Sequence, residues 1–157
     1  NWAFDTSAVD GSWDYLFLNT TAAKANHSST TAPTSTTFNT SGTTYNSSSM
    51  IAYCFHSVAG YSKVGSFVGT GAAGLKIDLD FEPAYILTKR VSSSGASWSI
   101  IDNKRSTGSD KKNYLQANSN AAETTSSTGI TFNTDGFTFN GSSFNTNGAT
   151  HMYMTFA

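Results

Sequence analysis

The sequence predicts an all-β fold, an antiparallel β-sandwich or barrel, and three observations lead to this prediction. Serine, threonine, asparagine and glycine make up nearly half of the 157 residues, yet aromatic residues still reach 13%. Short apolar segments alternate with polar residues at a period of two, the period of a half-buried strand. Charged residues are only 12% of the chain, and the net charge is −1. This balance disfavours both a long charge-paired helix and the basic surface of a nucleic-acid binder.

The expected strands lie between turns rich in glycine, serine and asparagine. Leu75, Ile77 and Leu79 alternate with polar residues and predict one buried and one solvated face. Phe132 and Phe137 flank an Asp-Gly turn and predict a hairpin. The expected strands are 13–18, 50–58, 75–80, 84–91, 97–102, 130–133, 137–139 and 150–156. The only helix candidate, residues 121–124, is too short to be stable.

An internal repeat is the most informative feature of the chain. Matching residues recur in the same order with similar spacing: Trp2 and Asp5 with Trp98 and Asp102, Tyr15-Leu16 and Asn19 with Tyr114-Leu115 and Asn118, 37–40 with 131–134, Gly42 and Asn46 with Gly136 and Asn140, and Phe55 with Phe156. Such matches indicate related copies of one structural unit. Residues 61–157 are therefore expected to form a complete β repeat, and residues 1–60 the C-terminal part of an earlier one.

The repeat makes two structural predictions. Phe38 and Phe132 should occupy equivalent buried positions, as should Phe55 and Phe156. The first copy also lacks a counterpart of the 84–91 strand, and an unpaired sheet edge promotes association unless something covers it. The sequence is therefore expected to be a fragment of a longer chain, or to receive the missing strand from another segment or subunit.

Four segments between residues 15 and 102 resemble a known family. They are 15–23, 51–67, 81–90 and 98–102. They resemble the β-rich domains repeated in tail-fibre and other virion proteins of tailed bacteriophages, especially marine and cyanobacterial ones. The resemblance implies a lectin-like, jelly-roll type sandwich, a structural role in an extracellular virion, and a homo-oligomer, with a trimer as one candidate. It implies no catalytic or metal-binding residues.

The residues themselves argue against an enzyme. Glu82 and Glu123 are the only glutamates, and no Gly-x-Ser-x-Gly motif or Cys–His nucleophile pair is present. We expect a non-enzymatic virion protein without cofactors, part of a tail fibre or surface appendage that contributes to host attachment. A glycan-binding module and a capsid-decorating protein are the alternatives, and a polysaccharide depolymerase is less favoured.

The expected partners follow from the same reading. They are other copies of the chain, other virion proteins and a host surface polysaccharide. Neither nucleic acid nor membrane insertion is expected, because the charge is near neutral and no apolar run approaches the length of a membrane span.

Two groups of charged residues are candidate binding sites. Six basic residues cluster around the 84–102 hairpin and the loop after it: Lys89, Arg90, Lys104, Arg105, Lys111 and Lys112. They could meet phosphate or carboxylate groups of a polysaccharide, although an ordinary soluble surface explains them as well. Asp78, Asp80 and Glu82 share one strand face and are weak candidates for Ca²⁺, but a solvated face is the preferred interpretation.

The remaining conspicuous residues are assigned to structure. Trp2 and Trp98 lie in apolar segments and are expected in the core rather than as sugar-stacking platforms. Cys54, the only cysteine, is expected to be a small buried hydrophobe. The three histidines, His27, His56 and His151, are far apart and lack the spacing of metal ligands.

Overall fold

The computed structural model describes residues 2–28, 30–39 and 49–157, and every regular element in these residues is a β-strand. The strands are β1 (Ala3–Thr6), β2 (Asp14–Phe17), β3 (Ala25–Asn26), β4 (Ser62–Val68), β5 (Lys76–Asp78), β6 (Tyr85–Arg90), β7 (Ser99–Asp102), β8 (Asp110–Gln116), β9 (Thr124–Asn133), β10 (Gly136–Phe139) and β11 (Thr150–Phe156). All neighbouring strands pair antiparallel. The described residues contain no helix of the length and hydrophobicity needed to cross a membrane.

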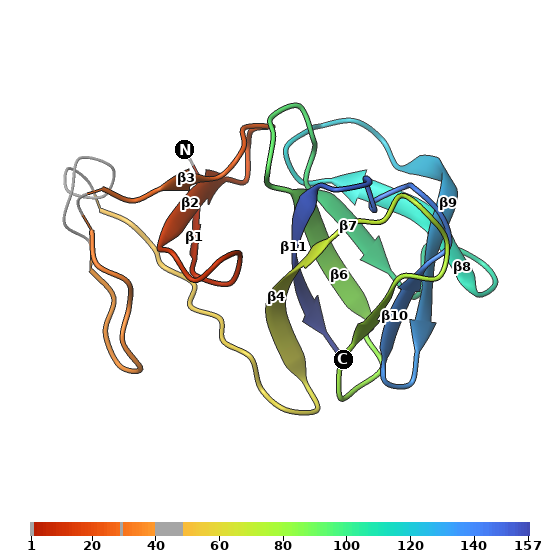
Figure 1. Ribbon diagram of the computed structural model, residues 1–157, viewed down its shortest axis with the longest axis horizontal. Helices are drawn as coiled ribbons and strands as arrows, with labels where there is room; N and C mark the ends of the chain where they lie inside the picture. The colour runs from red at the N-terminus through yellow and green to blue at the C-terminus, as the bar shows by residue number, and fades with distance from the viewer. Residues whose placement is uncertain (1, 29, 40–48) are drawn as a thin grey trace.

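Eight strands form one sheet that curls into a nearly closed, barrel-like shape (Figure 1). Their order is β4-β11-β6-β7-β8-β9-β10-β5, so β4 and β5 are the two end strands. Lys63 on β4 reaches towards β5 and donates a hydrogen bond to the Asp78 carbonyl at 3.3 Å. On the inside, the ring of Phe67 on β4 packs against Phe139 on β10, with ring centroids 4.9 Å apart.

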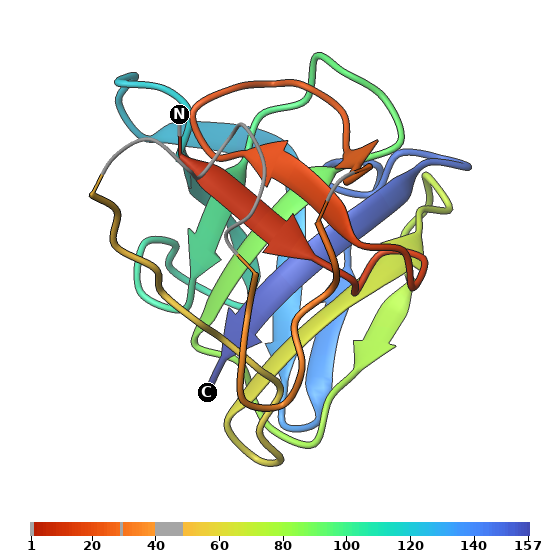
Figure 2. The ribbon, with the colours of Figure 1, turned by 90° about the vertical axis from the view of Figure 1, so that its left-hand side faces the viewer.

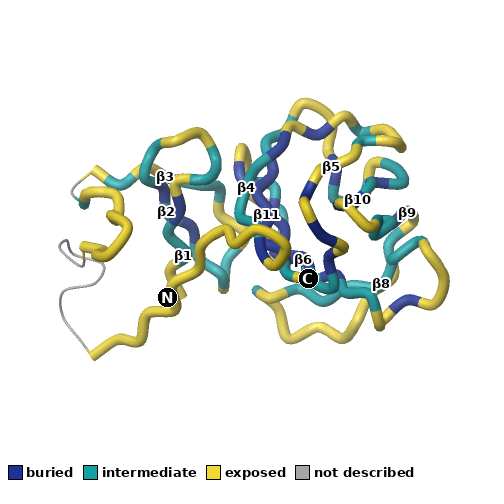
Figure 3. Tube along the Cα trace, turned by 90° about the horizontal axis from the view of Figure 1, so that it is seen from below, coloured by how far each residue is buried: buried dark blue, intermediate teal, exposed yellow. Residues whose placement is uncertain are grey.

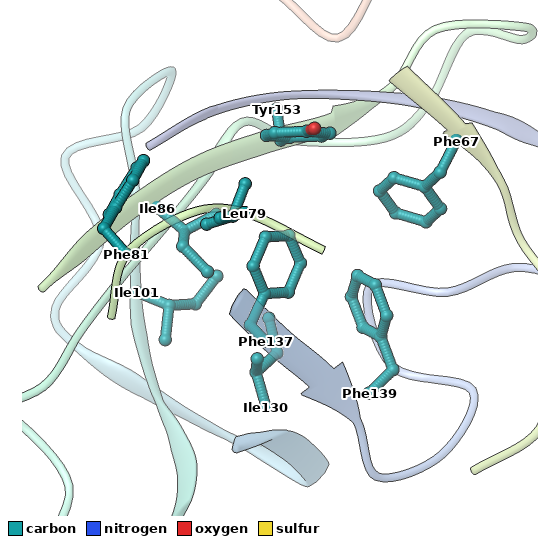
Figure 4. Close-up of a cluster of buried hydrophobic side chains, with 9 residues drawn as sticks. All are labelled: Phe67, Leu79, Phe81, Ile86, Ile101, Ile130, Phe137, Phe139 and Tyr153. Carbon is teal, nitrogen blue, oxygen red and sulfur yellow. The ribbon is translucent and has the colours of Figure 1, made fainter. Parts of the chain in front are cut away.

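The barrel-like sheet encloses the main hydrophobic core (Figure 4). Its buried side chains come from strands all around the sheet and from the loop between β5 and β6: Phe67, Leu79, Phe81, Ile86, Ile101, Ile130, Phe137, Phe139 and Tyr153. Phe137 and Phe139 are fully buried and pack edge to face, with ring centroids 5.6 Å apart. Each fully buried side chain of this size stabilises the fold by about 1.5–3 kcal/mol, so this core accounts for the curled shape.

The small sheet β1-β2-β3 packs on the outer face of the barrel, where it creates a second core (Figures 1 and 2). In Figure 2 the red and orange strands of this sheet cross in front of the blue strand β11. Leu16 of β2 is only 1% exposed and belongs to a cluster with Trp98, Met152 and Met154. Tyr153, between the two methionines, belongs to the inner core instead. Successive side chains of β11 therefore point alternately into the inner core and the outer core.

Most predicted strands are confirmed, and β11 has the predicted bounds. The Asp-Gly hairpin is also confirmed, because Phe137 pairs with Phe132 and Gly136 with Asn133. Gly136 has a φ of 151°, and a Cβ atom there would lie 2.1 Å from the Ile77 carbonyl oxygen. The close approach of β5 to this turn therefore requires glycine.

The predicted strand at 50–58 is wrong. Apart from an isolated bridge between Val58 and Ser62, residues 50–58 have no strand pairing in the described part of the chain, and all of them are exposed (Figure 3). Cys54 is exposed with them, so its predicted burial is also wrong. An apolar alternating segment becomes a strand only beside another strand edge. The segment at the corresponding place in the second copy, β11, has β4 on one side and β6 on the other.

The predicted burial of the matching aromatic pairs is also wrong. Trp98 is fully buried as predicted, but Trp2 is 72% exposed. Phe38 is 51% exposed and Phe55 is 55% exposed, whereas their counterparts Phe132 and Phe156 are half-buried. The reason is that the barrel surrounds only the later residues of each pair. The predicted matches at Thr40, Gly42 and Asn46 lie outside the described residues.

Candidate functional site

A pocket of about 430 Å³ lies at one end of the barrel, within the range of ligand-binding cavities. The ends of β6, β7, β8 and β11, an early residue of β9, and the loops at 92–97 and 141–147 contribute to it. The cations of its lining, Lys89 and Arg90, are neighbours on β6. No aspartate or glutamate is found among the described residues that line it.

Arg90 has unused hydrogen-bonding capacity. Its Nε atom is buried and finds no hydrogen-bond partner among the described residues. Its Nη2 atom donates to the Ser94 carbonyl in the adjoining loop at 3.3 Å. A buried N–H group without a partner costs about 1–3 kcal/mol.

Lys89 belongs to the wall of the site. Only 2% of the residue is exposed, and its ammonium group donates to the Ala96 carbonyl and lies 5.9 Å from the centre of the Trp98 ring. Burial, together with the charge of Arg90, lowers the pKa of Lys89 to about 8. These contacts hold the 92–97 loop against the barrel, so Lys89 helps to shape the pocket.

His151 is the neutral partner of Arg90 across the sheet. The two residues face each other in the β6–β11 register. The His151 Nε2 atom accepts a hydrogen bond from the Thr146 N–H group at 3.2 Å, which assigns the ring proton to Nδ1. Burial and the charge of Arg90 lower the pKa of His151 to about 4. The ring is therefore uncharged at neutral pH.

The rest of the lining combines aromatic rings with hydroxyl groups. Tyr114 and Phe144 pack edge to face, with ring centroids 5.1 Å apart. Phe144 has a φ of 59°, a left-handed backbone conformation that non-glycine residues rarely adopt. The hydroxyl-bearing residues are Thr88, Ser97, Ser99, Ser126, Ser143 and Thr146. A few fixed polar groups beside aromatic surface are typical of sites for small polar ligands.

The structure divides the six predicted basic residues. Lys89 and Arg90 line the pocket, whereas the other four lie on β8 and the turn before it: Lys104, Arg105, Lys111 and Lys112. Arg105 pairs with Asp102 at 2.6 Å and with Glu123 at 3.2 Å. Lys112 pairs with a neighbouring aspartate, and Lys111 donates to two backbone carbonyls of the turn. Lys104 is exposed.

The three predicted acidic residues are engaged separately. Asp78 pairs with Lys76 at 2.8 Å, and Asp80 accepts a hydrogen bond from the Gly60 N–H group at 2.7 Å. Glu82 is exposed. Throughout the described ranges, no three histidine, cysteine, aspartate or glutamate side chains are close enough together to hold a metal ion.

A second notable feature is that β1-β2-β3 repeats the strand register of β7-β8-β9. Phe4, two residues after Trp2, pairs with Leu16. Ile100, two residues after Trp98, pairs with Leu115, the match of Leu16. Likewise, Tyr15 pairs with Ala25, and Tyr114 pairs with Thr124. The correspondence includes two hydrogen bonds to side chains. The backbone N–H group of Trp2 donates to the side-chain oxygen of Asn19, and that of Trp98 donates to the side-chain oxygen of Asn118.

The exposed large apolar side chains are concentrated in the first part of the described chain. Of the large apolar side chains that are exposed in the described residues, only Val68 lies beyond residue 61. The others are Trp2, Phe38, Met50, Ile51, Tyr53, Phe55, Val58 and Tyr61. Exposed apolar side chains that gather into one patch mark an interaction site or an aggregation liability.

A family model described as a domain of unknown function, DUF7483, matches residues 1–157. The chain belongs to this family. No curated protein and no solved structure matches the chain. The DUF7483 description names no activity, ligand or partner.

Proposed function

We propose that the chain is a non-enzymatic structural module of an extracellular assembly built from repeated β units, a tail fibre or related surface appendage of a bacteriophage virion. The observation that carries this proposal is the shared register of β1-β2-β3 and β7-β8-β9. Under this proposal, residues 1–60 are the later part of one unit and residues 61–157 are the next unit. The sequence resemblance to repeated virion domains supplies the virion context.

Firm packing between the two units supports a mechanical role. The Trp98 Nε1–H group donates to the Phe17 carbonyl at 2.9 Å, across the interface between the sheets. Backbone hydrogen bonds from Lys24 to Val91 and from Gly95 to Thr21 add two further links, at 3.0 and 2.9 Å. Together with the buried Leu16 cluster, these contacts join successive units rigidly.

The first unit also has a surface that is suited to assembly. In the second unit, β6 pairs with β7, but β1 is the end strand of its sheet in the described residues. The exposed apolar segment that includes Ile51 and Tyr53 is the counterpart of β11, which is buried between two strands. Further units that cover these places would remove an aggregation liability. Repetition would then multiply weak contacts with a host surface through a high effective concentration.

Light scattering of the purified chain at micromolar concentration tests the assembly. We expect the wild-type chain to form oligomers, and Trp2→Ser and Ile51→Ser each to shift it towards monomers. Val68→Ser is the matched control, because Val68 is 61% exposed but lies on the second unit. A wild-type chain that remains a sharply melting monomer would contradict the proposal.

The pocket at Arg90 favours a second function, attachment to a polysaccharide on the host surface. Its lining offers an arginine, hydroxyl groups and aromatic rings without a competing carboxylate among the described residues. A glycan array tests this function: the chain should retain acidic glycans more strongly than neutral ones. Equal retention of both classes would speak against it.

A further inference from the structure

We infer that the pocket binds the carboxylate group of a uronic-acid-type sugar, with the Arg90 guanidinium as its anchor. The inference rests on the proposed attachment function and names the chemical class of its ligand. It is independent of the proposed assembly, because every residue that lines the pocket lies between Thr88 and His151, within the second unit.

The charges of the residues that line the pocket favour an anionic ligand. Arg90 carries a positive charge into a lining without aspartate or glutamate in the described chain, and its buried Nε–H group is not used by any described residue. The planar guanidinium can donate two parallel hydrogen bonds to the two oxygens of one carboxylate. Burial and, after it, the positive charge of Arg90 lower the pKa values of Lys89 and His151.

Lys89, the second cation of the lining, does not act as the anchor of the carboxylate. The Lys89 ammonium group donates to the Ala96 carbonyl and lies over Trp98, and only 2% of the residue is exposed. His151 is neutral, so Arg90 is the cation of the described lining that keeps a donor without a partner. One guanidinium matches a monoanionic carboxylate, whereas phosphate sites gather several cations or a nest of backbone N–H groups.

The rest of the lining suits a sugar ring. Tyr114 and Phe144 provide aromatic surface for the apolar face of the ring, while Ser99, Ser143 and Thr146 offer hydroxyl groups to its polar edge. The register of β6 with β11 and the left-handed backbone of Phe144 set these groups around Arg90 before a ligand arrives. A site that is organised in advance loses less conformational entropy on binding.

Titration calorimetry with three defined probes tests the ligand class. The probes are trigalacturonic acid, its methyl ester and inorganic phosphate, each added to the full chain. We expect trigalacturonic acid to bind, and the ester and phosphate to bind at least about tenfold more weakly, because only the acid offers a carboxylate on a sugar ring. No binding of the acid, equal binding of the ester, or tighter binding of phosphate would each overturn the inference.

Three variants test the anchor. Arg90→Gln should weaken trigalacturonic acid binding about tenfold or more, and Arg90→Lys should lie between it and wild type, because lysine keeps the charge but loses the two-pronged geometry. Lys104→Gln removes one charge from an exposed position outside the pocket and should bind like wild type. Equal weakening by Arg90→Gln and Lys104→Gln would show a nonspecific charge effect and overturn the assignment.

Two further measurements separate folding, assembly and ligand binding. A thermal melt of each variant identifies one that has not folded. If Arg90→Gln fails to fold, the affinity of Arg90→Lys for trigalacturonic acid still tests the anchor. The comparison of the acid with its ester on the wild-type chain still tests the ligand class. Light scattering of the same samples reports assembly separately. Loss of acid binding with unchanged oligomers would implicate the pocket, and monomers that still bind the acid would refute only the assembly.

Discussion

The side-chain oxygen of Asn118 accepts a 2.7 Å hydrogen bond from the backbone N–H group of Trp98, across 20 residues of chain. Asn19 makes the same contact with Trp2, but at 3.3 Å. The shorter bond lies beside a fully buried tryptophan, and the longer one beside a tryptophan that is 72% exposed. The same local connection is therefore kept in two environments that differ in access to water.

This difference predicts that replacing Asn118 and Asn19 by alanine lowers the free energy of unfolding by different amounts. Asn118→Ala should lower the free energy of unfolding by about 1–2 kcal/mol, because it leaves the Trp98 N–H group without its partner in a part-buried place. Asn19→Ala should cost less than about 0.5 kcal/mol, because water replaces the lost partner at the exposed site. Urea unfolding of both variants measures the two losses, and equal losses would contradict the prediction.

The interface between the small sheet and the barrel should be energetically important. Leu16→Ala should lower the free energy of unfolding by about 2–5 kcal/mol, because Leu16 is 1% exposed and its removal leaves a cavity beside Trp98. Val68→Ala, at a 61% exposed position, should change it by less than about 0.5 kcal/mol. Urea unfolding followed by tryptophan fluorescence reports both values. A Leu16→Ala loss as small as the control would show that the small sheet is held loosely.

His151 should make the stability depend on pH. Its pKa is lowered from 6.5 to about 4, so the unfolded chain takes up a proton more readily than the folded one. Its contribution is fully present above about pH 6.5 and is lost as the pH falls towards 4, by no more than about 3 kcal/mol. Urea unfolding at several pH values should show this loss in wild type and a weaker one in His151→Gln. Replacing the exposed His56 by Gln is the control and should leave the slope unchanged.

Lys89 should destabilise the fold through its buried charge. Its pKa is lowered from 10.5 to about 8, so stability should rise between about pH 8 and 10.5 as the folded chain releases this proton. Lys89→Met keeps the apolar stem and removes the charge, and we expect it to raise the free energy of unfolding at pH 7 by about 1 kcal/mol. Urea unfolding is the measurement. A loss greater than about 1 kcal/mol would mean that the contacts with Ala96 and Trp98 outweigh the desolvation of the ammonium group.

The fold could be predicted from the sequence where strands show strong alternation. Residues 84–91 and 150–156 are rich in apolar residues, and β6 and β11 form there. β4 and β8 were missed, because 62–68 contains two serines and a glycine and 110–116 begins with three charged residues. Pairing with neighbouring strands, rather than their own apolar content, places these two segments in the sheet.

The opposite error occurred at 50–58, where the alternation is strong but no strand forms. Periodicity shows that a segment is suited to a sheet, but it cannot show whether a partner edge is available. The burial of Phe38 and Trp2 was overestimated for the same reason, since both lie in the part of the chain that is not enclosed by the barrel.

The candidate site could be predicted only in part. Adjacent lysine and arginine residues at 89 and 90 pointed to an anion site, and both line the pocket. The contributions of His151, Tyr114 and Phe144 were missed, because they depend on strand register and on one loop rather than on neighbours in sequence. Aligning the predicted strands 84–91 and 150–156 would have placed His151 opposite Arg90 and was the one available signal.

The position of β11 between β4 and β6 has a consequence for how the protein is made. β11 leaves the ribosome after both of its neighbours, β4 and β6, and its side chains contribute to both hydrophobic cores. Until β11 has been synthesised, the edges of β4 and β6 that pair with it have no partner strand. The outer face against which Leu16 packs also lacks Met152 and Met154. The barrel and the surface that holds the small sheet can therefore form only after β11 has been synthesised, and a nascent chain stalled before Thr150 would expose unpaired strand edges to chaperones and to neighbouring nascent chains.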